Sequence, residues 1–400
     1  MEIDMISVIE AQKMIDQCVR SLDAEAIPLA DVHGRVLREA VASSEEIPPF
    51  DRSAMDGYAI RADDAADEFE VVGEIRAGDA VQREIAPGKA IRIFTGAQLP
   101  CEDLKVVMQE HVEASGQRIR LMQRSRQSNI RKRGEDAKVG EILLQAGTTL
   151  DATAVALLAS IGKTPILVSK LPSILHVTTG DEIVAPESTP KAGQIRNSNA
   201  SLISGLCREQ GVGGVRHIHV GDDLKVMRES LADAKAETYD MVLFSGGSGD
   251  GAYDFSAKLF ETLGATLRFR QVDMRPGKPL IFATTSSQLL FGLPGNALSH
   301  HVCFHLFVRR AIDRLLERPA GVLTKGVLIE PMDNTMNARE TWWPARTSFV
   351  GGRVECHALS WKSSGDITRL PVANALLKVP ASTPLLSAET IVELLLTRTI

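Results

Sequence analysis

The pattern of hydrophobic and polar positions changes several times along this chain of 400 residues. Residues 5–22 and 155–162 repeat apolar side chains at the spacing of an amphipathic helix. Between them, short runs such as YAIRA and FEVVGEI alternate with Gly, Asp and Pro, which is typical of strands joined by turns. We therefore expect a β-rich domain over 43–137, inserted into a helical linker domain made of 1–42 and 138–170.

From residue 171 to about 317, runs that favour strands alternate with runs that favour helices. The strand-like runs are SILHVTTG, VRHIHVG, DMVLFSGG, LIFAT and LLFGL, and Ser198 and Asp254 are expected helix N-caps. This alternation predicts a doubly wound parallel sheet. Over 318–400 the helical runs stop and strand-like runs return. The fold class is thus α/β and multidomain, with a central sheet domain, the β-rich insert, the linker and a small C-terminal β-barrel.

Charge and cysteine content narrow the class of protein. The formal net charge is −6, so the overall field repels nucleic acid, and the basic stretch between Arg124 and Arg133 carries no interleaved aromatic residues. The five cysteines lie far apart without a CxxC pair, which favours reduced thiols. No basic and apolar leader is present, and no apolar run reaches about 18 residues. We expect a cytoplasmic protein without membrane or nucleic-acid partners.

Three glycine-rich turns follow or precede apolar strands: SGGSGDG (245–251), RPGKP (275–279) and GLPGN (292–296). Backbone N–H groups approach phosphate oxygens closely only where no Cβ intervenes. In doubly wound sheets, ligands bind outside the carboxyl ends of the strands, where the SGGSGDG, GLPGN, TTGDE and GDD turns are expected. The apolar LIFA run is expected to carry RPGKP to the edge of the sheet. The pattern predicts a site for a phosphorylated ligand.

The SGGSGDG turn also permits other interpretations. Gly247, Gly249 and Ala252 have the spacing of a dinucleotide fingerprint, so a dehydrogenase stays an alternative. Against it, the turn belongs to the third strand–helix unit, and Asp254 would place a carboxylate beside the pyrophosphate. A nucleophile elbow is disfavoured because Asp250 stands where that motif needs glycine, and no P-loop is present.

Acidic and basic residues accompany these turns. Asp222, Asp254 and Glu182 are expected at strand ends, where carboxylates near phosphate indicate a bridging Mg²⁺. Asp223 is better interpreted as a helix N-cap. In RPGKP, Arg275 and Lys278 offer cations suited to oxyanions.

Two histidine pairs, His217 with His219 and His301 with His305, could each bind a metal. Neither pair has a third ligand at a useful spacing, so structural histidines are the preferred interpretation.

Several long motifs, taken together, resemble the MoeA family, the molybdopterin molybdenumtransferases that include the gephyrin E domain. The resemblance covers nearly the whole chain. It rests on PPFDRSAMDGYAIR (48–61), IRIFTGAQLP (91–100), VVMQE (106–110), NIRKRGEDAKVGEILLQAGTTL (129–150), TTGDEI (178–183), GQIRNSN (193–199), the SGG turn with Asp254, MRPGKP (274–279) and GLPGNALS (292–299).

The resemblance implies an elongated homodimer in which the sheet domain of one subunit faces the inserted domain of the other. It implies insertion of molybdate into adenylated molybdopterin with Mg²⁺ as cofactor, hydrolysis of the adenylate, and release of AMP and molybdenum cofactor. It also implies molybdopterin adenylyltransferase and molybdoenzyme apoproteins as partners. A non-catalytic molybdopterin-binding or scaffold protein of the same fold is the alternative.

The resemblance implies roles for residues of this chain, and for Asp56, Thr95 and Asp136 it is the only ground. The expected catalytic residues are Asp56, Asp136, Asp222, Asp254 and Lys278. The expected ligand-binding residues are Thr95, Gly246, Gly247, Ser248, Arg275, Pro279, Pro294, Gly295, Asn296 and Ser299, and the expected metal ligands are Glu182, Asp222 and Asp254.

The chain departs from the family pattern at four places. Ser248-Gly249-Asp250-Gly251 replaces the usual Val-Ser-Val/Met-Gly, Ala297 replaces a proline, and Arg275 replaces a lysine. In the tail, RETWWPAR (339–346) stands for the expected Arg-x-x-Phe-x-Arg, so Arg346 and Ser364 are weaker candidates.

Overall fold

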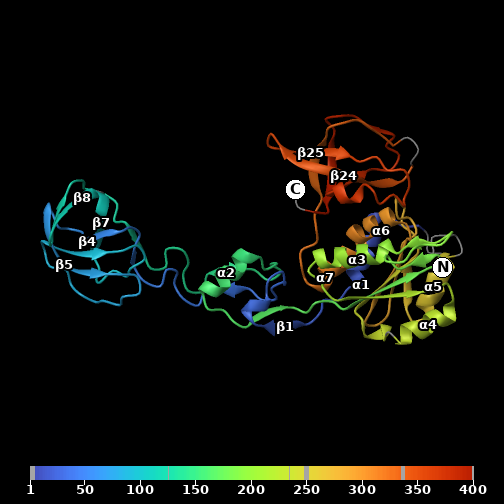
Figure 1. The fold of residues 1–400 in the computed structure, drawn as a ribbon, viewed down its shortest axis with the longest axis horizontal. Helices are drawn as coiled ribbons and strands as arrows, with labels where there is room; N and C mark the ends of the chain where they lie inside the picture. Colours follow the sequence, from blue (N-terminus) through green and yellow to red (C-terminus); the bar gives the residue numbers. More distant parts are fainter. Residues whose placement is uncertain (1–4, 125, 234, 247–251, 335–337, 399–400) are drawn as a thin grey trace.

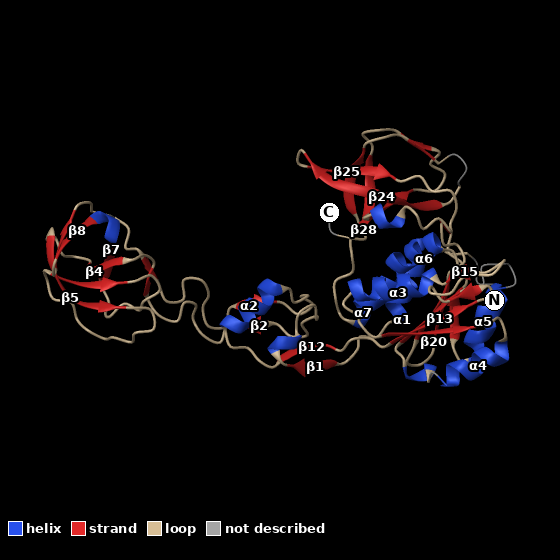
Figure 2. Cartoon of the chain, in the orientation of Figure 1, coloured by secondary structure: helices blue, strands red, loops and turns tan. Residues whose placement is uncertain are grey.

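The computed structural model describes residues 5–398 apart from 125, 234, 247–251 and 335–337, and it describes only the backbone of residues 252–255. The chain is elongated, with a β-rich body at one end, a small middle body, and two bodies side by side at the other end (Figure 1). Most helices gather in one of these last two (Figure 2). No helix among the described residues is long and apolar enough to span a bilayer.

The β-rich body contains a six-stranded sheet in the order β7-β4-β6-β5-β9-β8. Alternate side chains of β4 point to opposite faces, so Tyr58 and Ile60 join one apolar cluster and Ala59 joins another. Burial on both faces explains the short, apolar strands of the predicted insert, which is confirmed. The bounds are β3 Arg52–Ser53, β4 Gly57–Arg61, β5 Glu68–Ile75, β6 Lys89–Ile93, β7 Leu104–Met108, η2 Gln109–His111, β8 Val112–Ser115, β9 Arg118–Leu121 and β10 Ile130–Arg131.

The middle body is formed by two separate stretches of the chain, which pair as β1 with β12 and β2 with β11. One helix, α2, covers them, and its N-cap Asp151 accepts a hydrogen bond from the Ala154 N–H at 2.8 Å. Leu158 and Val168 are fully buried in its core. The bounds are β1 Ala24–Ile27, η1 Leu29–Asp31, β2 Val41–Ala42, β11 Ile142–Leu144, α2 Ala152–Ser160 and β12 Ile166–Ser169.

The central sheet has the order β16-β13-β17-β21-β20-β18. The first four strands are parallel, as the alternating pattern predicts, whereas β20 and β18 are antiparallel to their neighbours. The doubly wound sheet domain is therefore confirmed with a mixed rather than a fully parallel sheet. The bounds are β13 Ile174–Thr179, β14 Ile183–Val184, β15 Ile195–Arg196, β16 Val215–Val220, β17 Met241–Ser245, β18 Thr266–Phe269, β20 Ile281–Thr284 and β21 Leu289–Leu293.

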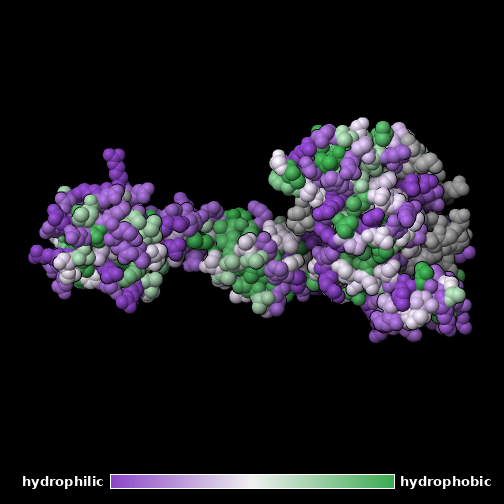
Figure 3. Space-filling model, turned by 45° about the horizontal axis from the view of Figure 1, so that its top comes forward, coloured by the Kyte–Doolittle hydropathy of each residue, from purple (hydrophilic) through white to green (hydrophobic). Residues whose placement is uncertain are grey.

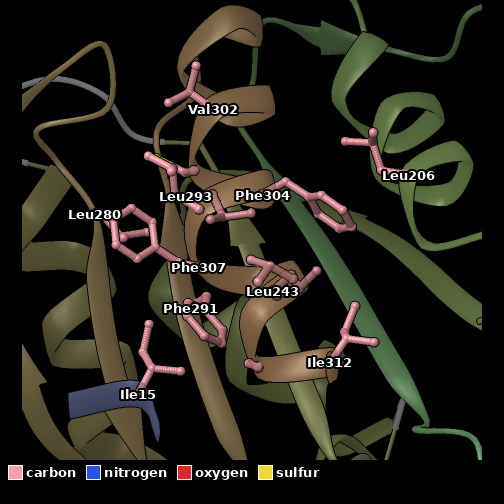
Figure 4. Packing of buried hydrophobic residues seen from close by; sticks show 14 of the residues in the cluster. Ile15, Leu206, Leu243, Leu280, Phe291, Leu293, Val302, Phe304, Phe307 and Ile312 are labelled. Carbon is pink, nitrogen blue, oxygen red and sulfur yellow. The ribbon is translucent and has the colours of Figure 1, made fainter. Parts of the chain in front are cut away.

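Helices cover both faces of this sheet (Figure 1). On one face, Leu243 and Phe291 pack against Phe304 and Ile312 of the long C-terminal helical segment (Figure 4). The neighbouring Phe244 points to the opposite face and packs on α5. The bounds are α1 Val8–Cys18, α3 Ser198–Glu209, α4 Leu224–Asp233, η3 Ala236–Thr238, α5 Ala252–Thr262, α6 Ala297–Cys303, the π-helical η4 Phe304–Val308 and α7 Arg309–Leu315.

Helix α1 packs with the sheet body and not with the middle body. Its Val8, Ala11 and Ile15 are buried in the same cluster as the helical segment after residue 297. A capping box between Ser7 and Glu10 starts the helix. We therefore propose that the linker body begins after α1, while the other predicted domain boundaries stay predictions.

Strands β24, β25, β22, β28 and β26 form a closed five-stranded barrel, because β26 also pairs with β24. This confirms the predicted C-terminal β-barrel. The short strand β19, which precedes the RPGKP turn, pairs with β24 and ties the barrel to the sheet body. The bounds are β19 Met274–Arg275, β22 Thr324–Leu328, β23 Met332–Asp333, β24 Glu340–Val350, β25 Arg353–Ala358, η5 Leu370–Val372, β26 Ala375–Val379, β27 Leu385–Leu386 and β28 Ile391–Leu396.

Two predicted helix caps are wrong. Helix α3 is capped by Asn197, whose side chain accepts from the Ala200 N–H at 3.0 Å, so Ser198 is its first helical residue. Helix α5 begins at Ala252, which places Asp254 within its first turn and not at its N-cap. Asn and Ser are nearly equivalent as caps, so sequence alone did not separate adjacent candidates.

Asp223 is the predicted cap that the structure confirms. Its Oδ1 accepts from the backbone N–H groups of Lys225 and Val226, at 2.8 and 3.0 Å, at the start of α4. These hydrogen bonds lower the pKa of the Asp223 carboxyl.

Candidate active site

The four parallel strands end in register at one edge of the central sheet. Thr179 of β13 lies opposite Val220 of β16, and Ser245 of β17 lies opposite both Thr178 and Leu293. The turns that follow β13, β16 and β21 therefore begin side by side, as the sequence predicts.

Gly246 is the first residue after β17 and packs tightly against the end of β13. Its φ is +144°, and a Cβ at this position would lie 2.2 Å from Thr179 Oγ1. Only glycine fits this approach. The predicted ligand-binding residues Gly247 and Ser248 come next and lie outside the described residues, so their role stays a prediction.

The RPGKP turn reaches the same edge from the opposite direction. Because β20 is antiparallel to β21, with Ile281 opposite Gly292, Lys278 lies beside the end of β21. On the other side of the turn, Arg275 lies opposite Thr341 of the barrel. The turn is thus held between the sheet and the barrel.

A cavity of about 260 Å³ opens where the RPGKP turn, the GLPGN turn and the barrel meet. Six of the predicted site residues line it: Arg275, Lys278, Pro279, Pro294, Asn296 and Ser299. The other lining residues are Met274, Pro276, Gly277, Arg339, Trp361 and Ser364.

Ser364 of the barrel fixes the GLPGN turn. Asn296 Nδ2 donates to Ser364 Oγ at 2.8 Å, and the N–H groups of Leu298 and Ser299 donate to the Ser364 carbonyl at 3.0 and 3.3 Å. Two amides at the start of α6 are therefore occupied by the barrel and do not face a ligand. Asn199 Nδ2 secures the turn from α3 by donating to the Gly295 carbonyl at 2.8 Å.

The cavity is positively charged. Arg275, Lys278 and Arg339 line it, and within the described part of the chain no carboxylate does so. The Arg275 guanidinium lies 4.8 Å from the centre of the Trp361 ring, which holds the cation in place. Arg339 also pairs with Asp273, with Nε 3.5 Å from Oδ1. Arg275 and Lys278 are therefore the main cations of the cavity. Together with the hydroxyl of the buried Ser299 they suit a small oxyanion.

Three carboxylates, Asp181, Glu182 and Asp222, follow strands β13 and β16, on the side of the sheet away from the cavity. The Asp222 N–H donates to Asp181 Oδ1 at 3.2 Å. Burial, followed by the nearby charges of Asp181 and Glu182, raises the pKa of the Asp222 carboxyl. Like charges in this arrangement favour either a proton or a cation between them.

The predicted metal set of Glu182, Asp222 and Asp254 stays a prediction. Of the residues that the structure describes, no three His, Cys, Asp or Glu side chains are arranged to hold a metal ion. The side chain of Asp254 lies outside the described residues. Carboxylate oxygens are nevertheless the ligands that Mg²⁺ prefers, and the raised pKa of Asp222 marks a repulsion that a cation would relieve.

Asp56 directly precedes β4 and Thr95 follows β6 in the β-rich body, whereas Asp136 lies between β10 and β11. The β-rich body lies at the opposite end of the molecule from the sheet and barrel bodies that form the cavity (Figure 1). Thr95 donates to Asp56 Oδ1 from its backbone N–H at 2.8 Å and from its hydroxyl at 2.7 Å, which lowers the pKa of Asp56. Asp136 accepts from Arg131. Within one chain these residues do not join the cavity.

The surroundings of the two histidine pairs differ: one pair contacts a threonine hydroxyl, and the other is buried. The ring nitrogens His217 Nε2 and His219 Nδ1 lie 3.0 and 3.1 Å from Thr178 Oγ1. His301 and His305 are buried, and their ring nitrogens have no hydrogen-bond partner in the described structure. Neither pair belongs to a metal-binding group among these residues.

Sequence reasoning missed Arg339 and Trp361 as cavity residues. Both come from the C-terminal part of the chain, and only the barrel's packing brings them to the sheet edge. The RETWWPAR motif was a signal, but it pointed to Arg346, which is exposed on β24 and does not line the cavity. Ser364, a weaker candidate, does line it.

Comparisons with known proteins agree with this fold. Family models describe residues 6–162 as "MoeA N-terminal region (domain I and II)", 176–314 as "Probable molybdopterin binding domain" and 334–397 as "MoeA C-terminal region (domain IV)". The chain is 32% identical to the molybdopterin molybdenumtransferase of Bacillus subtilis, over 94% of this chain and 91% of that protein. It is 33% identical to that of a Nostoc species, over 96% and 92%.

A crystal structure of the molybdopterin biosynthesis MoeA protein from Pyrococcus horikoshii superposes with a TM-score of 0.82. The identity is 29%, and the match covers 98% of this chain and 100% of that one. A multidomain α/β protein with a cationic cavity between sheet and barrel is the class that the structure defines. The chain belongs to the MoeA family.

Proposed function

We propose that this chain is a molybdopterin molybdenumtransferase, which inserts molybdate into adenylated molybdopterin and hydrolyses the adenylate, releasing molybdenum cofactor and AMP. The cationic cavity between the RPGKP and GLPGN turns is the main supporting observation. The names of the curated relatives point to the same activity.

Molybdate is assigned to this cavity. Lys278 supplies a compact charge and Arg275 a planar guanidinium, while Ser299 contributes a hydroxyl from the first turn of α6. Interactions with charged donors are stronger in a site that excludes water. Tungstate, with nearly the same size and charge, is expected to bind there as well.

The adenylate is assigned to the rest of the sheet edge. From β21 to β16 there are three inter-strand steps, on the order of 14 Å, which an extended nucleotide ligand can span. Along this path Gly246 follows β17, Glu182 follows β13, and Asp222 follows β16 at the end. Asp222 and Asp254 would orient the attacking water.

A magnesium ion is expected at the acidic end. Glu182, Asp222 and Asp254 would hold it, and it would supply neutralisation of the phosphate charge during cleavage. The raised pKa of Asp222 supports this assignment, because neighbouring carboxylates need a counter-charge there.

We further propose a homodimer in which the partner's β-rich body completes each site with residues equivalent to Asp56, Thr95 and Asp136. The elongated shape leaves these residues far from the cavity of their own chain (Figure 1). Hydrophobic residues gather on a face of the middle body (Figure 3), and among the apolar residues assigned to this body Val139 and Ile142 are 64% and 47% exposed. Molybdopterin adenylyltransferase would supply the substrate, and molybdoenzyme apoproteins in the cytoplasm would receive the product.

The assay is AMP release by the purified protein from adenylated molybdopterin with Mg²⁺, with and without molybdate. We expect release that depends on molybdate, and a Lys278→Ala variant with a molybdate KM raised about tenfold or more, since a hydrogen-bonded charge is lost. Lys163→Ala is the control, because Lys163 is a partly exposed lysine of the middle body that pairs with Glu39 and does not line the cavity. Adenylate binding without cleavage would instead support the scaffold alternative, and no adenylate binding would exclude both.

A further inference from the structure

Beneath the cavity, two buried histidines and a serine connect β13, β17 and the GLPGN turn. His176 Nε2 lies 2.6 Å from Ser245 Oγ, and Ser245 Oγ lies 3.3 Å from His300 Nε2. The other ring nitrogen of His300, Nδ1, lies 3.1 Å from the Pro294 carbonyl oxygen. His176 and His300 are both 0% exposed, and Ser245 is 2% exposed.

The direction of every hydrogen bond in this group follows from the Pro294 carbonyl, which can only accept. His300 must therefore carry its proton on Nδ1. Burial lowers the pKa of His300 to about 4, so near neutral pH its Nε2 is bare and accepts from the Ser245 hydroxyl. The single hydrogen of the Ser245 hydroxyl points to His300, so the Ser245 oxygen accepts from His176 Nε2–H.

His176, at the other end of the network, is consistent with these donor and acceptor assignments. His176 Nδ1 is buried and has no hydrogen-bond partner in the described structure, as expected for the nitrogen left without a proton. Burial, with the nearby His300 and His217, lowers the pKa of His176 well below its usual range, so the ring stays neutral.

We propose that His176, Ser245 and His300 form a one-directional hydrogen-bond chain that fixes the GLPGN turn against the end of β17. Both histidines are then positioning residues for the oxyanion cavity, which Pro294 lines. The kinetic part of this inference rests on the proposed function.

The position of each member supports a role in holding the turns. Ser245 is the last residue of β17 and directly precedes Gly246, while Pro294 directly follows β21. One network therefore joins the end of β17 to the GLPGN turn, whose Pro294 lines the cavity. Burial alone does not explain the hydrogen bonds of His300. The neighbouring His301 is almost as buried, at 4% exposed, yet its ring nitrogens have no hydrogen-bond partner in the described structure.

The first experiment measures the protonated nitrogen of each histidine by ¹⁵N NMR of the whole protein at neutral pH, without ligand. We expect His300 as the Nδ1–H tautomer and His176 as the Nε2–H tautomer, with both signals shifted in Ser245→Ala. His300 protonated on Nε2, or signals unaffected by Ser245→Ala, would overturn the proposal.

The second experiment measures the molybdate KM and kcat of AMP release in His300→Leu, His300→Asn and His301→Leu. Loss of the two hydrogen bonds is expected to raise the molybdate KM about tenfold in His300→Leu. His300→Asn can restore the donor to Pro294 and should recover most of this loss. His301→Leu, the matched control, should keep the wild-type KM, and equal effects at both positions would indicate a purely structural role.

Two further measurements keep the test decisive. If His300→Leu does not fold, His176→Leu removes the other histidine of the hydrogen-bond network. This variant should raise the molybdate KM severalfold. If the wild-type protein releases no AMP, the proposed function fails, and calorimetric titration of molybdate into the same variants then decides the positioning role by the same ranking of affinities.

Discussion

At the residue scale, Gly277 lines the cavity and packs closely against buried neighbours. Its φ is +102°, and an added Cβ would lie 2.5 Å from Met274 Cε and 2.7 Å from Cys303 Sγ. Both neighbours are buried, so neither moves away without disturbing the core beneath the RPGKP turn. Glycine is therefore required here by backbone conformation and by space.

Gly277→Ala is expected to lower the free energy of unfolding by about 2–3 kcal/mol through strain and overpacking. It should also weaken molybdate binding, because Lys278 is the next residue. Gly88→Ala is the control, since Gly88 has φ +73° but open space around it, and only the conformational cost, about 1 kcal/mol, should remain. Urea titration measures both, and equal losses would contradict the packing argument.

At the element scale, the continuous helical segment α6–η4–α7 buries three histidines. Burial lowers the pKa of His300 and of His301 to about 4 and that of His305 well below its usual range. In the unfolded chain each histidine binds a proton near pH 6.5, so between pH 6.5 and about 4 the unfolded state holds more protons than the folded state. The stability of the fold is therefore lost as pH falls through this window.

The free energy of unfolding should fall by about 1.4 kcal/mol per pH unit for each such histidine in the lower part of this window. The double variant His301→Leu, His305→Leu should remove the contribution of two of them and flatten the slope between pH 6 and pH 5. Urea midpoints at several pH values measure the slope. An unchanged slope in the double variant would show that these two rings are not buried in their neutral form.

The elements were largely predictable from the sequence, because period-two and helical spacing record which side chains are buried. The direction of strand β20 was predicted wrongly: a parallel strand was expected, and the strand is antiparallel to β21. LIFAT and LLFGL have the apolar character of parallel strands, yet Thr285–Gln288 is too short a connection for a parallel crossover and forces a hairpin. That loop length was the signal that predicts the antiparallel β20.

At the scale of the whole molecule, the cavity combines segments that the sequence cannot place together. The GLPGN turn was predictable at this edge because it follows its strand, whereas RPGKP precedes its strand and reaches the same edge only because β20 is antiparallel to β21. Lys278 and Ser299 both line the cavity there. Trp361 and Arg339 arrive through the docking of the barrel, which no local pattern encodes. Asp56 directly precedes β4, and the body that contains β4 lies at the opposite end of the molecule from the barrel (Figure 1), so its proposed role requires a second copy.

This dimeric site predicts complementation between two inactive variants. Asp56→Asn and Asp222→Asn should each lose most activity, because each removes one carboxylate from every site. Mixing and reassembling equal amounts should restore about a quarter of wild-type activity, since half of the dimers are mixed and each mixed dimer has one intact site. A mixture as inactive as its components would show that the two residues do not share a site across subunits.

The most direct measurement is anomalous diffraction at the molybdenum edge from crystals of the protein soaked in molybdate. We expect a peak within the cavity lined by Arg275, Lys278 and Ser299, lost in Lys278→Ala crystals. A molybdenum peak only elsewhere, or none in this cavity at saturating molybdate, would contradict the assignment of the cavity to the oxyanion.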